Sequence, residues 1–176
     1  MQEQLSSIWL VADFFTHHYR VSGRLNVRSR KLADQLNDAS TSFLGLEEAY
    51  VSNIERPADI LTSHPTLTLR KDNIVAAVVA RQQDGLRREQ TYGSYFGTYL
   101  RKVFLTVPSF GIEGYLYLSS RLDLLTVFAT GTDKFLLVLD GQMRVSTRPD
   151  VVFAGGAILV NKSHVGVFCE EEDEED

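Results

Sequence analysis

The stretch YRVSGRLNV, residues 19–27, decides the fold, because its pattern returns as FGIEGYLYL at residues 110–118. In both stretches apolar residues alternate with polar or small ones, as in a strand with one buried face. A glycine occupies the same place in each, Gly23 and Gly114, 91 positions apart. Glycine inside a strand marks a bend, a bulge or a close backbone approach. The two stretches predict one glycine-bent strand that the chain uses twice.

The repeat extends over most of the chain, at a spacing of 91 or 92 residues. Matching apolar positions include Phe14 and Leu105, Phe43 and Phe135, Leu46 and Val138, Val51 and Met143, and Leu69 and Val160. The changes of spacing fall between apolar runs, where loops accept an extra residue. We therefore expect two divergent copies of one unit, roughly residues 8–80 and 101–169.

Each copy is predicted to be a five-stranded antiparallel meander. The expected strands are 9–15, 19–27, 42–54, 66–70 and 73–80, then 102–107, 110–118, 135–146, 157–161 and 164–168. The proline-bearing segments 55–65 and 147–156 are expected to be loops. Asp140 and Gly141 are expected to form a tight hairpin turn.

Composition divides the chain into four parts: a first unit (1–81), a polar linker (82–100), a second unit (101–169) and a tail (170–176). All seven residues of the tail are acidic, whereas the remaining 169 carry 18 basic and 16 acidic side chains. Such dense like charge favours a disordered tail. It would act as a solubility tail or compete with nucleic acid for a basic face.

The overall composition, 44% hydrophobic and 23% charged, is typical of a soluble globular protein. No stretch reaches the roughly 20 apolar residues of a membrane helix, and the first 15 residues lack the pattern of a secretory signal. The lone Cys169 permits neither an internal disulfide nor a cysteine-based zinc site. We expect a cytoplasmic protein without a membrane partner.

Three motifs follow in the order of a known family: the glycine-bent strand, LADQLN at 32–37, and LTLRKDNIVAAV at 67–78. This order resembles the Sm-like fold, and in particular a tandem, uncharacterised bacterial variety of it. Asp34, Leu36 and Asn37 match the family's Asp-x-x-(Met/Leu)-Asn turn, and Arg70, Asn73 and Ile74 match its closing Arg-Gly-x-Asn-Ile/Val segment. The resemblance implies an all-β protein of two tandem Sm-like units, each a small, five-stranded, strongly bent antiparallel sheet or barrel.

The chain departs from the family at several places. Lys71 stands where the family has glycine, and the segment 38–42 lengthens the connection after Asn37. In the second copy the turn reads TVFA at 126–129, and the closing segment lacks arginine.

The resemblance also implies a binding site for single-stranded RNA, in which Asn37 and Arg70 read a base and Asp34 holds the turn. An asparagine amide can bond a base edge, and arginine offers a stacking plane and a charge. The alternative is that Asp34 and Asn37 only satisfy a tight turn through their own side chains. The second copy lacks all three residues, which favours this alternative.

The sequence contains no nucleophile elbow, phosphate-binding glycine loop or metal-binding spacing. His17 and His18 are adjacent, so within a strand they would point to opposite faces. We therefore predict no enzymatic activity, no catalytic residue, no metal and no cofactor.

The predicted function is a non-enzymatic Sm-like interaction module that self-associates through its sheet edges, as a homo-oligomer or with a partner protein. The alternative is single-stranded RNA binding through the first unit's turn. No DNA partner is expected.

Overall fold

The structure, a computed structural model, describes residues 8–87, 99–118, 128–129 and 133–171. Its strands are β1 (Trp9–Phe15), β2 (Tyr19–Asn26), β3 (Phe43–Asn53), β4 (Arg56–Arg70), β5 (Ala76–Val79), β6 (Tyr99–Val107), β7 (Phe110–Leu118), β8 (Phe135–Val145), β9 (Arg148–Asn161) and β10 (Val167–Glu170). They form a ten-stranded sheet whose paired neighbours are all antiparallel. The prediction of an all-β fold is confirmed.

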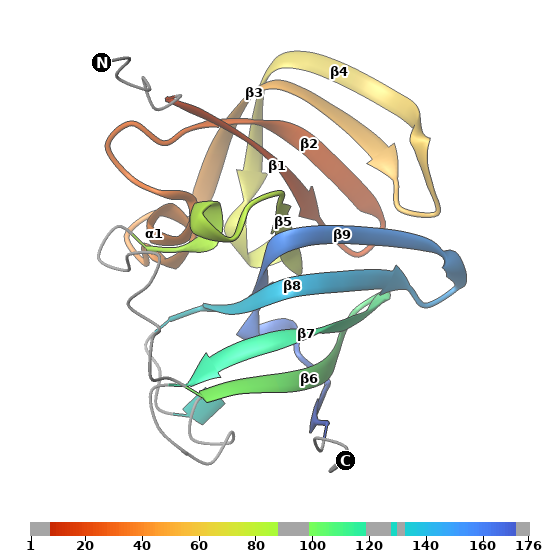
Figure 1. Ribbon diagram of the computed structural model, residues 1–176. Helices are drawn as coiled ribbons and strands as arrows, with labels where there is room; N and C mark the ends of the chain where they lie inside the picture. Colours follow the sequence, from red (N-terminus) through yellow and green to blue (C-terminus); the bar gives the residue numbers. More distant parts are fainter. Residues whose placement is uncertain (1–7, 88–98, 119–127, 130–132, 172–176) are drawn as a thin grey trace, which may run out of the picture.

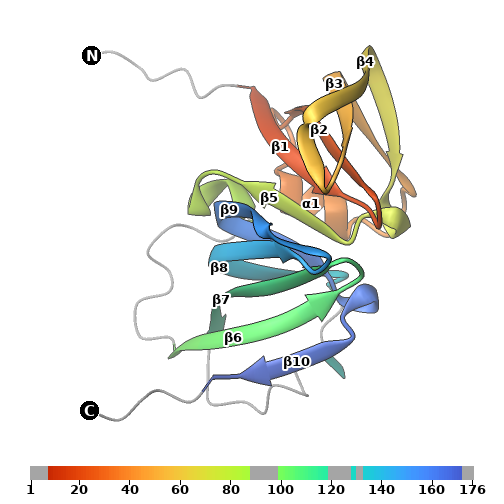
Figure 2. The same ribbon diagram turned by 90° about the vertical axis from the view of Figure 1, so that its right-hand side faces the viewer.

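The strand order is β10-β6-β7-β8-β9-β5-β1-β2-β3-β4. The first half (residues 8–87) contributes β5-β1-β2-β3-β4, and the second half (residues 99–171) contributes β10-β6-β7-β8-β9 in the corresponding order. The two halves meet where β5 pairs with β9, in the middle of the molecule (Figures 1 and 2). The repeat in the sequence thus has a counterpart in the order of the strands.

The β5–β9 pair lies between two hydrophobic cores. Ala77 and Val79 of β5 enter the core that belongs mainly to the first half, whereas Ala76 and Val78 enter the core of the second half. The partner strand divides in the same way, with Leu159 in the first core and Ile158 in the second. Since successive side chains of a strand point to opposite faces, both faces of this pair are covered. This explains why the paired stretches, 76–79 and 157–160, are wholly apolar.

The two repeated glycines allow close packing against the neighbouring strand. A Cβ atom on Gly23 would lie 3.0 Å from Cβ of Ala49, and one on Gly114 would lie 2.4 Å from a methyl carbon of Val138. The register between strands shifts at both positions. The predicted bends are therefore places where the sheet folds over itself.

Asp140 and Gly141 do not form the predicted hairpin turn, since both lie inside β8. Asp140 has φ 47°, and so has Glu48 at the corresponding place in β3. A left-handed residue inside a strand bends the strand without ending it. The predicted chain reversal at Asp140 and Gly141 is therefore wrong, although the backbone at Asp140 does have a positive φ.

The segments 55–65 and 147–156, predicted as loops, are instead the outer parts of the long strands β4 and β9. The prolines that suggested loops fall at positions that the pairing register skips: Pro57, Pro65 and Pro149. Proline is compatible with a strand where its missing N–H is not needed.

The remaining boundaries also differ from the prediction. The motif LADQLN forms a short helix, α1 (Leu32–Asn37). The 3₁₀ helices are η1 (Lys71–Asn73), η2 (Gln82–Gly85) and η3 (Lys162–His164). In the predicted linker (82–100), residues 82–85 form η2 and residues 99–100 begin β6. Residues 88–98 of this linker lie outside the described residues. Glu170, the first residue of the predicted tail, belongs to β10, and residues 172–176 are not described.

Replacing Gly114 by alanine should destabilise the protein by about 1–3 kcal/mol, the usual cost of extra volume in a packed core. The new Cβ atom would also lie 2.9 Å from the carbonyl oxygen of Leu139. Gly45→Ala is the matched control, because a Cβ atom there meets nothing within 4 Å, and it should change stability by less than about 0.5 kcal/mol. Urea unfolding measures both variants. Equal losses would contradict the close approach.

Candidate interaction surfaces

Asn37, which the resemblance assigns to RNA binding, has its side chain engaged within the protein. Its amide nitrogen donates to the carbonyl oxygen of Ala33 at 2.9 Å. Its amide oxygen accepts a hydrogen bond from the backbone N–H of Phe135, also at 2.9 Å. The side chain thereby connects α1 of the first half to the start of β8 in the second half.

Arg70 and Asp34 lie on neighbouring segments. Arg70 is the exposed last residue of β4, and its guanidinium carbon lies 4.5 Å from the centre of the Phe43 ring. Asp34 lies in the first turn of α1, where its carbonyl oxygen accepts a hydrogen bond from Arg30. The structure thus brings α1 close to the segment that follows β4, and the contact between them is made by another residue.

That residue is Lys71, the departure from the Sm-like pattern. Its side chain is buried, and its ammonium group donates to the carbonyl oxygens of Gln35 and Asp38 and to the hydroxyl of Thr41. Burial lowers the pKa of Lys71, although the nearby Asp38 carboxylate opposes this effect. Lys71 therefore fastens residues 35–41 to η1, across the place where the family has a glycine.

The segment that Lys71 holds is further fixed by Asp38. Its carboxylate accepts hydrogen bonds from Ser40 and from Arg30, which lies 2.7 Å away. These hydrogen bonds, those from Ser40 first, hold the pKa of Asp38 well below its usual range. The loop after α1 is thus closed by its own polar contacts.

Lys71→Met should destabilise the protein by about 1–3 kcal/mol, because the carbonyl groups of Gln35 and Asp38 would lose a buried hydrogen-bond donor. Lys134→Met is the control: Lys134 is 48% exposed and lies 3.9 Å from Asp72, and a surface pair of this kind contributes less than about 1 kcal/mol. Thermal or urea unfolding compares the two. If both variants unfold together with the native protein, Lys71 does not hold the loop.

The sheet has two open edges, since β4 and β10 end the strand order. Within the described residues neither pairs with a strand on its outer side. Both edges expose apolar side chains: Ile60 is 56% and Leu61 60% exposed on β4, and Val167 is 50% exposed on β10. An uncovered strand edge offers unpaired backbone groups to another chain.

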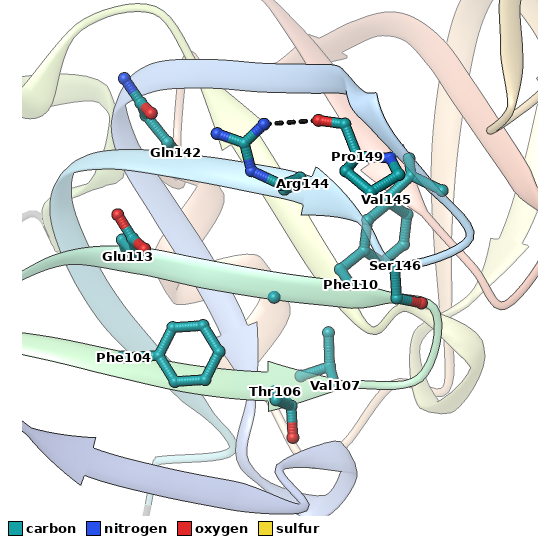
Figure 3. Close-up of a pocket in the computed structure, with 11 residues that line it drawn as sticks. Phe104, Thr106, Val107, Phe110, Glu113, Gln142, Arg144, Val145, Ser146 and Pro149 are labelled. Carbon is teal, nitrogen blue, oxygen red and sulfur yellow. Dashed lines mark hydrogen bonds between the residues drawn. The ribbon is translucent and has the colours of Figure 1, made fainter.

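A groove of about 440 Å³ lies on the outer face of β6, β7 and β8 (Figure 3). Phe104, Thr106, Phe110 and Glu113 line it from β6 and β7, and Gln142 and Arg144 line it from β8. Arg144 donates to the carbonyl oxygen of Pro149, which closes one end (Figure 3). The groove thus has aromatic walls and polar groups along its rim. The sequence does not reveal this groove, because its residues come from three separate strands.

Histidines from the two halves gather at one end of the junction. The ring of His17 lies 5.8 Å from that of His164 and 6.3 Å from that of His18, centre to centre. His164 contacts the carbonyl oxygen of Asp72 at 2.7 Å through Nε2. The described residues contain no group of three or more histidine, cysteine or acidic side chains able to hold a metal ion.

No protein-family model, curated protein or solved structure matches this chain. None of the helices in the described ranges is long and apolar enough to cross a membrane. The fold and surfaces thus define an all-β protein whose described sheet ends in two open edges.

Proposed function

We propose that the chain is a non-enzymatic, Sm-like interaction module that associates with further copies of itself, β4 of one copy pairing with β10 of the next. The observation that carries the proposal is the β5–β9 pair, in which the two halves already join edge to edge. By the spacing of the repeat, β10 is the counterpart of β5, and the inner part of β4 is the counterpart of the inner part of β9. The two open edges therefore match the two edges that meet inside the chain.

The internal junction gives the register of the proposed one. Ala76 pairs with Val160 and Val78 with Ile158. Shifted by the 91-residue spacing, these pairs become Val167 with Leu69 and Cys169 with Leu67. Pairing in this register would cover Val167, which is half exposed, with the core that already contains Leu69.

The edge of β4 is suited to accept another strand only along this stretch. Its outer part contains Pro57 and Pro65, and proline cannot donate to a ladder. The stretch 66–69, TLTL, contains neither proline nor charge. Natural proteins usually protect such edges with charges or prolines, so an unprotected stretch supports a pairing role. The strand order within each half and the match of Asp34, Leu36 and Asn37 support the Sm-like assignment.

Leu67→Cys should form disulfide-linked dimers with Cys169 of another copy under mild oxidation. Directly opposed residues of an antiparallel pair have Cα atoms about 4.5–5.5 Å apart, within the span of a disulfide. Thr68→Cys is the matched control, because its side chain points to the other face of β4. Non-reducing electrophoresis with peptide mapping measures the products.

Light scattering on the native chain provides the second measurement. The proposal is overturned if the chain remains a single copy at every concentration tested, or if the two cysteine variants cross-link equally. Either result would mean that β4 and β10 do not meet in the register of the internal junction.

RNA binding through Asp34, Asn37 and Arg70 has less support, because the Asn37 amide is engaged with Ala33 and Phe135. We expect Arg70→Ala to leave any affinity for uridine-rich or adenine-rich oligomers unchanged, with Asn37→Ala weakening only the fold. Fluorescence anisotropy at two salt concentrations tests this expectation. Tight binding that Arg70→Ala abolishes in a folded protein would favour the RNA alternative.

A further inference from the structure

Within the chain, the β8–β9 hairpin of the second half covers the outer face of the first half. The Phe153 ring lies 4.6 Å from the ring of Phe15, centre to centre, and the Arg20 guanidinium carbon lies 5.7 Å from the same ring. Nearer the hairpin tip, Thr147 donates a hydrogen bond to Glu55 at 2.6 Å. Phe15, which Phe153 covers, is fully buried. The edge pairing of β5 with β9 is thus accompanied by a hairpin that packs on the face beside it.

The groove of the second half is the counterpart of this covered face. At the spacings of the repeat, the groove residues Phe104, Thr106, Gly111, Gln142 and Arg144 correspond to Asp13, Phe15, Arg20, Tyr50 and Ser52. The two residues that contact Phe153 in the first half are therefore replaced by smaller ones, Thr106 and Gly111. The same surface that is filled in the first half is hollow in the second (Figure 3).

The β3–β4 hairpin of the first half is the counterpart of the hairpin that does the covering. Its Arg56-Pro57 corresponds to Arg148-Pro149 at a spacing of 92 residues. By the pairing register, Ile60 corresponds to Val152 and Thr62 takes the place of Phe153, with Leu61 as the extra bulge residue between them. Ile60 and Leu61 are both more than half exposed. A single copy thus presents an apolar hairpin without a face to cover and a corresponding face without a hairpin.

We propose that the groove receives the β3–β4 hairpin of a second copy, with Ile60 and Leu61 as the inserted side chains. The inference rests on the proposed self-association, because pairing β4 with β10 would carry this hairpin over the groove as β9 carries Phe153 over Phe15. The ring of Phe104, which lines the groove from β6, suits branched aliphatic side chains. The occupant is therefore the same chain rather than a small molecule.

The double variant Ile60→Ser/Leu61→Ser should raise the dissociation constant of self-association at least about tenfold. The free energy gained by burying either aliphatic side chain is larger than the free energy that corresponds to a tenfold change in affinity. Gln142→Trp, which fills the groove from β8, should weaken it by a similar factor. Val11→Ser is the matched control, because Val11 is 69% exposed and lies on β1, outside the hairpin and the groove. Sedimentation equilibrium measures the dissociation constants, with circular dichroism to verify the fold.

The outcomes separate the two proposals. If the chain associates and Leu67→Cys cross-links to Cys169, but the hairpin and groove variants associate normally, the edge pairing stands and the hairpin inference is overturned. If Val11→Ser weakens association as much as the hairpin variant, the effect is general surface hydrophobicity and the inference also fails. A chain that stays single overturns both proposals.

Discussion

The structure depends on one interaction, the pairing of β5 with β9. All side chains of both strands in this pairing are buried, and they alternate between two cores, so neither half completes its core alone. The buried Asn161 reinforces the pairing by donating to the carbonyl oxygen of Ile74 at 3.0 Å, and the Asn37–Phe135 hydrogen bond spans the halves at another point. Both cores thus contain side chains from both halves, and their apolar contacts stabilise the two halves together.

The two halves differ at their edges, because β9 pairs with β5 inside the chain whereas β4, its counterpart, ends the sheet. Asn161, at the closed junction, is a short amide that can be buried because its polar atoms are bonded. Its counterpart at the open edge is Arg70, a long charged side chain that stacks on Phe43 and remains in water. A charge at the end of an edge strand limits indiscriminate pairing without preventing a specific one. The repeat thus keeps a common backbone while each copy adapts its edge to its neighbour.

The parts of the fold that sequence could predict are those that depend on local pattern. Alternation around Gly23 and Gly114 located β2 and β7, and the 91-residue spacing indicated that one arrangement recurs. The outer parts of β4 and β9 could not be predicted, because Pro57 and Pro149 signal loops unless the register that skips them is known. The role of Lys71 was equally hidden, since its acceptors lie 30 to 36 residues away in the chain. The groove could not be predicted either, because its shape depends on how separate strands lie side by side in the folded sheet.

The two-sided burial of β5 has a consequence for how this chain is made. A ribosome synthesises the segment Ile74–Val79 long before Ala157–Asn161. In the nascent first half β5 can therefore pair with β1 on one side, while its other edge and its second apolar face stay uncovered until β9 is translated. Exposed edges of this kind are the sites at which incomplete chains aggregate or exchange elements with one another. The same swap that threatens the nascent chain, β5 of one molecule taken up by β9 of another, would build a domain-exchanged dimer from native contacts alone.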